Sequence, residues 1–474
     1  MGVSALALAA SALGAGVTAL PGAVAASGFL GGNALILCVA VANGWTLSCL
    51  CACAKRSGCE SYPSLAGHYL GRSGRLLAAA NLILLLFAGV VICARVACDV
   101  LTPLLVQLSR FTDGEPLRIR RAGLGAGLLI AVAPLCLSDS LHGVRHASVG
   151  ALACHLYLAG VLATRLASAW GRGLLPWLEA GREGSFFGAV KPAGVRDTLA
   201  VLGVAFCAQF SVLQVYAELS RPTLRRASAA IATGMGAVLL VNATVANAGY
   251  LLLGDAGTPA DILGDCFPDE DLPMGVARAA LGVSLVLKVP ILMVPLVQAL
   301  AGAQKDLLSS DGSGDNEVGE DDDDGSDEHF GSDEDGSAGD ALEAPLLPHP
   351  GHHRRSSART HSVDELGGEP SALSGDGTFG KLGRVAGTLG ATWVCACAFP
   401  DASAVLHVVG NTCNCVANYI LPSTLYLLSD LHRGEGAPVI NASHTLSRSL
   451  DRLKALACLL LGLAVLVNFV ASIA

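Results

Sequence analysis

Charged residues are scarce in this chain: Asp, Glu, Lys and Arg together make up only 15% of its 474 residues. Hydrophobic residues make up 52%, and the mean hydropathy is +0.56. A soluble protein of this length cannot bury so much apolar surface in its core. The scarcity of charge therefore excludes a soluble globular protein and predicts an all-α chain that crosses a membrane many times.

Motifs of the common nucleotide-driven and hydrolytic proteins are also missing. The chain has no Walker A lysine loop, no Gly-x-Ser-x-Gly sequence and no His-Glu-x-x-His sequence. It has no basic stripe of the kind that nucleic acid binding requires. Three Cys-x-Cys pairs lie in apolar stretches without a histidine at ligand-like spacing, so no metal site is expected. These absences argue against an enzyme, an ATP-driven pump and a nucleic-acid partner.

Apolar windows of about 20 residues, the length that crosses a bilayer, recur eleven times along the chain. The first could be a signal peptide, but it lacks a basic N-terminal region and is interrupted by glycine and proline, so we interpret it as a transmembrane helix. Almost no polar sequence precedes it, as expected of a chain shortened at its N-terminus. The predicted spans are residues 3–26, 32–54, 76–104, 120–138, 146–170, 195–219, 227–253, 273–301, 381–400, 403–429 and 453–473.

Basic residues predict a cytoplasmic N-terminus, because cytoplasmic loops carry an excess of lysine and arginine. Lys55 and Arg56 follow the second span, which would place them inside. The loop 254–272 holds six acidic residues and no base, which would place it outside. Two other outer loops do carry arginine, so the excess of basic residues in the inner loops is clear but not complete. The membrane could be the plasma membrane or that of a vacuole or lysosome.

Residues 303–380 interrupt the apolar pattern. They hold 20 of the 39 acidic residues and 4 of the 30 basic ones. Because such a segment cannot form a core, we predict a disordered acidic cytoplasmic loop between helices 1–8 (residues 1–302) and helices 9–11 (residues 381–474). Acid-flanked serines and a dileucine sequence at 343–347 make kinases and sorting adaptors candidate partners. A tolerated insertion is the simpler interpretation, and we favour it.

The first and sixth spans are predicted to break in the middle. Leu13-Gly14-Ala15-Gly16 and Pro21 interrupt the first, and polar Gln209 and Ser211 follow Gly203 in the sixth. Such breaks are tolerated in hydrocarbon only where they are buried in protein or line a cavity. Freed N–H groups can hold an anion, and freed carbonyls a cation. Close helix packing by small residues is the alternative, but breaks at matching places favour a midplane binding site.

Charged residues inside apolar spans are the other functional candidates. Lys288 lies about mid-span, where a lone lysine costs several kcal/mol unless it is paired or hydrated, although it could instead extend to an interface. Arg95 and Asp99 stand four apart and can neutralise each other, more often as a structural pair. Glu218 with Arg221 at the inner end of the sixth span resembles a local ion network, a candidate inner gate.

The tenth span carries several polar groups close together. Asn411, Thr412 and Asn414 cannot all face lipid at low cost. They could join helices through hydrogen bonds or line a permeation path. The sequence leaves both interpretations open.

Four blocks of the chain follow one another as in a known family. They are residues 13–28; 215–223 with 249–251 and Gly254; 261–263 with Pro290 and Pro295; and 399–400 with 410–412 and 419–423. In these blocks the chain resembles the amino acid/auxin permease family, especially its sodium-coupled neutral amino acid transporters and the vacuolar amino acid transporters of plants. The resemblance covers nearly the whole chain outside residues 303–380.

This resemblance implies eleven transmembrane helices in a LeuT-like five-plus-five inverted repeat, with helices 1 and 6 broken. It implies a secondary active transporter that moves small neutral amino acids by alternating access. The backbone of residues 14–16 would meet the substrate carboxylate, and carbonyls of residues 206–208 would meet its amine. The substrate-binding residues carried over by position are Gly14, Ala15, Gly16, Phe206, Cys207, Ala208 and Gln209.

Two departures from the sodium-coupled members bear on the coupling ion. Those members usually have asparagine where this chain has Ala10, and threonine close to the place of Lys288. An ammonium there would compete electrostatically with Na⁺, and lysine at this spacing before Pro295 is similar to the vacuolar, proton-coupled members. We therefore expect coupling to H⁺ rather than Na⁺, through Ser11, Ser284 and Lys288, with no other cofactor. The alternative function is an amino acid sensor that signals through the cytoplasmic loop.

Overall fold

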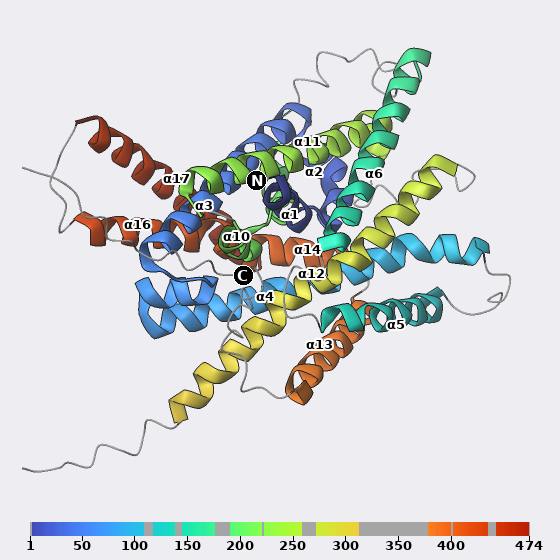
Figure 1. Ribbon diagram of the computed structural model, residues 1–474. Helices are drawn as coiled ribbons and strands as arrows, with labels where there is room; N and C mark the ends of the chain where they lie inside the picture. The colour runs from blue at the N-terminus through green and yellow to red at the C-terminus, as the bar shows by residue number, and fades with distance from the viewer. Residues whose placement is uncertain are drawn as a thin grey trace, which may run out of the picture. The chain divides into compact units, whose positions relative to one another are not determined.

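In the computed structural model, every regular element among the described residues is a helix (Figure 1). The described residues are 2–108, 117–137, 145–175, 190–219, 222–257, 272–311, 378–399, 402–434 and 442–473. Residues 1–306 and 378–474 form one compact unit, and residues 307–377 are a separate unit. Residues 312–377 lie outside the described residues, so the prediction of a disordered loop is not addressed there.

The first span is broken as expected. It consists of α1 (Gly2–Ala12), the short 3₁₀ helix η1 (Ala15–Ala19) and α2 (Leu20–Ser27), and the two arms meet at an angle of 59°. Gly14 between them is extended, with φ −165°. Pro21 stands in the first turn of α2, where its missing N–H leaves no hydrogen bond unmade. At Gly28, φ is +81°, a conformation that suits glycine, and the chain turns there into the next helix.

The sixth predicted span is also broken. Helix α9 (Val195–Ala205) and helix α10 (Gln209–Ala217) are joined by Phe206, Cys207 and Ala208 in non-helical conformation. The short η4 (Pro192–Gly194) leads into α9. Both interruptions predicted from glycine and polar residues are therefore present as breaks in the helices.

The remaining helices fall within or overlap the other predicted ranges. They are α3 (Phe29–Ser57), α4 (Tyr62–Leu108), α5 (Leu117–Cys136), α6 (Arg145–Arg172), α11 (Leu224–Gly257), α12 (Leu272–Asp311), α13 (Thr378–Ala398), α14 (Ala402–Asn411), α15 (Cys413–Cys415), η6 (Val416–Ile420), α16 (Leu421–Gly434) and α17 (Ala442–Ile473). Among the described residues, seven helices are long and apolar enough to cross a membrane, or eight spans if the bent first pair counts as one. The chain is thus a polytopic membrane protein, and the number eleven stays a prediction.

Two boundaries differ from the sequence prediction. Helix α12 continues past residue 302 to Asp311, into the range assigned to the acidic loop. The tenth span is interrupted near Thr412 and continues as η6, a wider π-type turn. Side chains from distant helices hold this distorted backbone: Asn81 donates to the Cys413 carbonyl over 3.1 Å, and the Tyr62 hydroxyl donates to the Ala417 carbonyl over 2.8 Å. These pairings are long-range and leave no local signal in the sequence.

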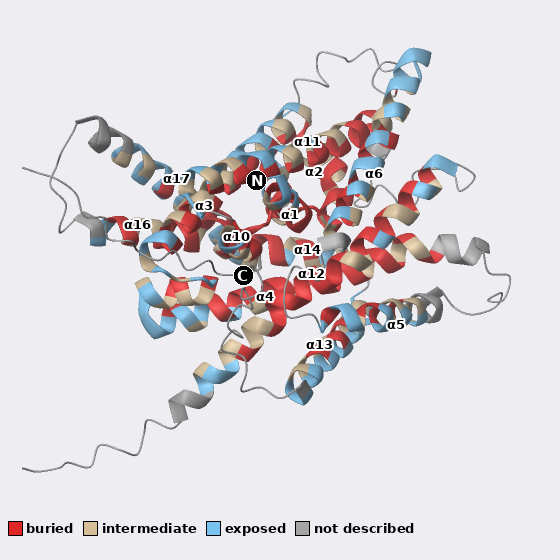
Figure 2. Cartoon of the chain, viewed as in Figure 1, coloured by how far each residue is buried: buried red, intermediate tan, exposed pale blue. Residues whose placement is uncertain are grey.

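The two broken spans lie at the centre of the helix packing. Helix α11 contacts α1, α2, α3 and α6, while α9 contacts α2, α3 and α14. Figure 2 shows α1, α2 and the middle of α12 as largely buried, whereas α13 and α17 expose one side. Gly410 of α14 lies so close to α9 that a Cβ there would fall 2.3 Å from the Ala200 carbonyl oxygen. Small residues thus bring the tenth span close to α9, the first arm of the sixth span.

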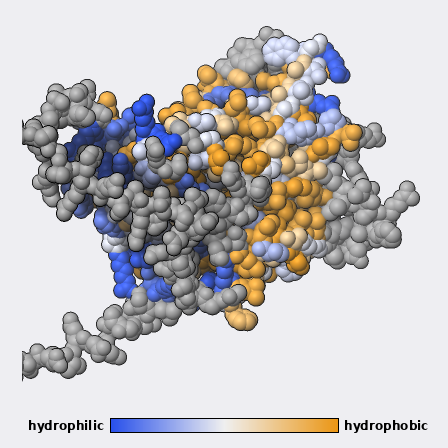
Figure 3. Space-filling view, in the orientation of Figure 1, coloured by the Kyte–Doolittle hydropathy of each residue, from blue (hydrophilic) through white to orange (hydrophobic). Residues whose placement is uncertain are grey.

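The outer surface of the unit is apolar in the way a lipid-facing surface is. Figure 3 shows hydrophobic residues over a broad area of the face in view, with hydrophilic residues gathered toward its edges. Helix α17, for example, exposes the apolar side chains of Leu456, Leu460, Leu463, Val467 and Val470. Contiguous exposed apolar surface of this kind indicates contact with lipid or with another apolar partner.

Candidate functional site

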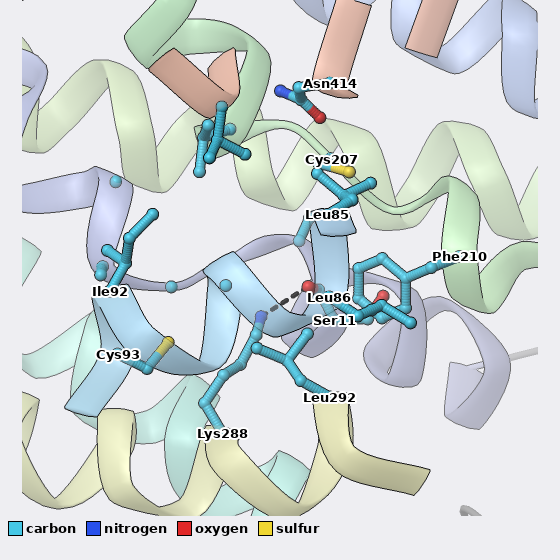
Figure 4. Close-up of a pocket in the computed structure, with 17 residues that line it drawn as sticks. Ser11, Leu85, Leu86, Ile92, Cys93, Cys207, Phe210, Lys288, Leu292 and Asn414 are labelled. Atoms are coloured by element: carbon cyan, nitrogen blue, oxygen red, sulfur yellow. Dashed lines mark hydrogen bonds between the residues drawn. The ribbon is translucent and has the colours of Figure 1, made fainter. Parts of the chain in front are cut away.

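The break in the first span is closed by a lysine from a distant helix. The Lys288 ammonium of α12 donates to the carbonyl oxygens of Ala10 at 2.9 Å, Ser11 at 2.5 Å and Leu13 at 2.5 Å. Lys288 is 4% exposed. Figure 4 shows its side chain rising from α12 toward the end of α1. The interfacial alternative for Lys288 is therefore wrong, because its charge is held inside the protein.

The physical reason for this contact is the end of α1. The last carbonyls of a helix have no partner within it and form the negative end of the helix dipole. In a membrane interior, such carbonyls need a donor, and an ammonium needs acceptors. One side chain satisfies both needs, so a positive charge stands where the broken helix presents its freed carbonyls.

A cavity of about 60 Å³ lies beside this contact. It is enclosed by residues from the first break, the sixth break, α4, α12 and the tenth span, and Lys288 is the one charged side chain among them. The lining residues are Ser11, Ala12, Gly14, Ala15, Gly16, Leu85, Leu86, Gly89, Ile92, Cys93, Val204, Cys207, Phe210, Lys288, Leu292, Val409 and Asn414. We call this space the central cavity. It brings together Gly14, Ala15, Gly16 and Cys207, which the sequence assigned to a substrate site.

The other predicted substrate residues lie outside this lining. Phe206 and Ala208 are fully buried at the break itself. The Gln209 amide is used within the protein: its Oε1 accepts from the Ala208 N–H at 2.9 Å, and its Nε2 donates to Asn43 Oδ1 at 2.8 Å. Gln209 thus ties the sixth span to α3, which differs from the predicted contact with substrate.

Asparagines satisfy the freed carbonyls of the sixth span. Asn242 of α11 donates to the Ala205 carbonyl at 3.0 Å, and Asn418 of η6 donates to the Gly203 carbonyl at 3.0 Å. The break is thereby held from two sides by neighbouring helices. Sequence reasoning missed these roles because the partners lie 37 and 215 residues apart.

The polar residues of the tenth span differ in what their side chains contact. Asn411 and Thr412 donate to carbonyls one turn earlier in their own helix. Asn414 lies on the central cavity, is fully buried, and has no hydrogen-bond partner for its Nδ2 or Oδ1 among the described residues. A buried amide without partners costs about 1–3 kcal/mol for each unmade bond. Asn414 is therefore positioned to bind a polar group inside the cavity.

Of the predicted ion-coupling residues, Ser11 and Lys288 meet at the central cavity, but Ser284 does not line it. The Ser11 hydroxyl donates to the Leu8 carbonyl at 2.8 Å and accepts from Ser211 at 2.7 Å, which links the two broken spans. Ser284 lies 3.1 Å from Nδ1 of His155 on α6. His155 is buried in the middle of an apolar span, and sequence reasoning gave it no role although its place in that span was a signal.

Two further cavities adjoin the central one, each sharing one lining residue with it. A cavity of about 150 Å³ shares Phe210 and contains Gln214, Gln298 and the ion pair of Arg75 with Asp306, whose Nε and Oδ2 are 2.9 Å apart. Gln214 Nε2 donates to Gln298 Oε1 at 3.2 Å. A cavity of about 90 Å³ shares Ser11 and is also lined by Ser211 and Glu218. In Figure 4 the Phe210 ring lies beside Ser11 at one side of the central cavity.

Arg95, Asp99 and Glu218 are not among the residues that line the central cavity. Arg95 Nε is 3.0 Å from Asp99 Oδ2, and Arg95 Nη1 also donates to the Ala396 carbonyl of α13 at 3.3 Å. This arrangement joins α4 to α13. Glu218 lines the cavity of about 90 Å³, and Arg221 lies outside the described residues.

Comparisons with known proteins agree with the four sequence blocks. The family model for transmembrane amino acid transporter proteins matches residues 1–430. Over 282 residues the chain is 24% identical to a Danio rerio protein named "Putative sodium-coupled neutral amino acid transporter 11", covering 59% of this chain and 60% of that protein. The chain thus spans about three fifths of that relative's length.

A crystal structure of a manganese transporter from Eremococcus coleocola aligns with 99% of this chain and 93% of its own, at 11% identity and a TM-score of 0.42. That likeness is too weak to assign a fold. The family match, in contrast, covers the chain from its first residue through most of α16 and confirms the resemblance stated from the sequence. The chain belongs to the family of transmembrane amino acid transporter proteins.

Proposed function

We propose that this protein is a secondary active transporter that moves small neutral amino acids across a membrane by alternating access, driven by H⁺ rather than Na⁺. The observation that carries the proposal is the Lys288 ammonium on the freed carbonyls of α1, beside a cavity lined by the broken first span. We further propose eleven spans in a LeuT-like five-plus-five inverted repeat, in which the broken spans correspond.

The central cavity favours a small neutral substrate. Its volume is about 60 Å³, and most of its wall is aliphatic, with Leu85, Ile92 and Leu292 among the lining residues. Among the described residues, its lining has no acidic side chain to neutralise a basic one, and the Lys288 ammonium is already occupied by three carbonyls. We expect the side chain of the substrate to lie against the aliphatic wall.

The polar ends of the substrate would meet the broken backbone and Asn414. N–H groups at the start of η1, at Ala15 and Gly16, lie at the positive end of a helical segment and suit a carboxylate. The Asn414 amide, buried and without a partner among the described residues, can take a hydrogen bond from the amine or give one to a side-chain oxygen.

Na⁺ independence follows from charge. A cation near the end of α1 would have to share carbonyls with an ammonium held 2.5 to 2.9 Å from them. Two like charges within a few ångströms in a medium of low dielectric repel strongly. Lys288 therefore replaces a metal ion at this place, and the driving gradient is that of protons.

Substrate would leave through the cavity of about 150 Å³. Phe210 borders both this cavity and the central one, so its ring is the barrier between them. With the N-terminus in the cytoplasm, α10 is the cytoplasmic half of the sixth span. The hydrogen bond of Gln214 with Gln298 and the ion pair of Arg75 with Asp306 lie further along that route.

The test is substrate exchange in proteoliposomes, which needs no gradient. Vesicles loaded with one small neutral amino acid should take up labelled small neutral amino acids. Gly16→Leu should abolish the exchange, because its Cβ would lie 3.3 Å from the Ala205 backbone and the larger side chain would distort the junction of the two breaks beside the cavity. Gly236→Leu on α11, where a side chain meets open space, is the matched control and should exchange like the wild type. Absence of exchange by the wild type for the whole panel would refute the proposal.

The sensor alternative depends on the acidic segment. Kinases and sorting adaptors would act there too, and the acid-flanked serines of residues 312–377 lie outside the described residues. The membrane in which the protein works also stays a prediction.

A further inference from the structure

A histidine lies buried beside the first break without a role in the proposal above. His155 on α6 is 1% exposed. Its Nδ1 is 2.8 Å from the Ala151 carbonyl oxygen and 3.1 Å from Ser284 Oγ. A carbonyl can only accept, so Nδ1 carries a hydrogen. In the neutral ring Nε2 is then a bare acceptor, and it has no hydrogen-bond partner among the described residues.

The surroundings of the ring single out two groups. Ser284 and Lys288 stand one helical turn apart on α12, so the ring that contacts Ser284 lies near the Lys288 ammonium. A Cβ at Gly14 would lie 3.6 Å from Lys288 Nζ, which places the break beside the same ammonium. Helix α1 has no ionisable side chain, and α11 has none between Arg226 and Tyr250. The Cys93 thiol of α4 lines the central cavity together with Lys288. Lys288 is therefore the charged group that faces the imidazole.

We propose that His155 takes up the coupling proton at Nε2 and, once protonated, donates a hydrogen bond to the Gly14 carbonyl. This deepens the transport function proposed above and rests on it. The proton comes from the aqueous phase of higher H⁺ concentration. The ring gains one positive charge, and no other bond forms or breaks. On the opposite side the same proton returns from Nε2 to water.

Charge explains why proton and substrate would travel together. In the empty site, an imidazolium beside the Lys288 ammonium is disfavoured by repulsion between like charges. A substrate carboxylate bound at residues 14–16 brings a negative charge next to both cations and offsets that repulsion. Each ligand then increases the affinity for the other by the same factor, which is the requirement for symport.

If His155 had only a structural role, that role would be to hold α6 against α12 through its hydrogen bonds. Replacement of His155 by glutamine keeps an amide that can bond to Ser284 but removes the group that titrates. A merely structural histidine would leave the proton dependence of transport unchanged. The two roles therefore differ in their effect on proton coupling.

The experiment compares two assays in the same proteoliposomes for wild type, His155→Gln and His155→Asn. One assay is gradient-free exchange of labelled alanine, and the other is alanine accumulation under an inward pH gradient of one unit. For one proton per substrate, that gradient supports about tenfold accumulation. We expect wild type to approach this limit, and both variants to exchange alanine but to accumulate none. Exchange affinity should fall with rising pH in wild type and stay flat in the variants.

His407→Gln on α14 is the matched control, since His407 is a half-buried histidine that does not line the central cavity. It should accumulate alanine like the wild type. The proposal is overturned if the His155 variants accumulate alanine under the pH gradient, or if both lose exchange together with accumulation, which would make the ring a requirement for binding or folding. Failure of the wild type to exchange would instead refute the transport function itself.

Discussion

Replacing Lys288 by methionine removes the charge and keeps much of the side-chain volume. Three buried carbonyls, those of Ala10, Ser11 and Leu13, then lose their donor. Each unmade bond costs about 1–3 kcal/mol, or about 3–9 kcal/mol for the three. Water entering from the central cavity and the relief from burying an ammonium both reduce the loss. We expect the variant to be less stable than wild type by about 3 kcal/mol.

The buried thiols of the protein provide the assay. Cys49, Cys51 and Cys53 are each no more than 3% exposed, so a thiol-reactive dye reports their exposure on thermal unfolding in detergent. Lys288→Met should unfold several degrees below wild type and should not accumulate substrate. Lys454→Met, which removes an exposed ammonium, is the control and should unfold like wild type. If Lys288→Met matched the wild type in both stability and driven uptake, the role given to the ammonium would be refuted.

Three further outcomes follow from the packing and the cavities. Gly410→Val should lower the unfolding temperature, because overpacking costs about 1–3 kcal/mol. Gly390→Val, where a side chain meets open space, is the control and should leave the unfolding temperature unchanged. Equal effects of the two substitutions in the dye assay would contradict the close approach of α14 to α9. Phe210→Ala should speed the labelling of Cys207 by a membrane-impermeant thiol reagent from the cytoplasmic side, measured by peptide mass spectrometry, and an unchanged rate would argue against a barrier there. Asn418→Ala should cost about 1–3 kcal/mol of stability in the dye assay by leaving a buried carbonyl of the sixth span without a donor.

The sequence was sufficient where physical constraints are local. Glycines in an apolar run predict a break in a membrane helix, because the backbone groups freed by it cannot face lipid. The break at Gly14 was predicted for this reason, and the break near Cys207 from polar Gln209 and Ser211 after Gly203. Lys288 was identified by the same reasoning, since a mid-span ammonium must find acceptors. The sequence did not specify which acceptors, because they lie 275 to 278 residues away.

Roles that depend on long-range pairing could not be predicted. Gln209 was assigned to substrate from its position, yet its amide is taken by Asn43, 166 residues away. Ser284 was assigned to the ion site, yet it faces His155. A single histidine in an apolar helix is a weak signal alone. It gains meaning from the break and the lysine beside it, which only the packing of α6 against α1 and α12 reveals.

The most direct test of the account is the choice of driving ion. Purified protein in proteoliposomes would be given an inward H⁺ gradient or an inward Na⁺ gradient in separate runs, with uptake of a panel of small neutral amino acids measured in each. Accumulation with H⁺ alone, unchanged when choline replaces Na⁺, is the predicted result. Accumulation that requires Na⁺ at a fixed pH gradient would contradict the claim that the Lys288 ammonium replaces a metal ion at the broken helix.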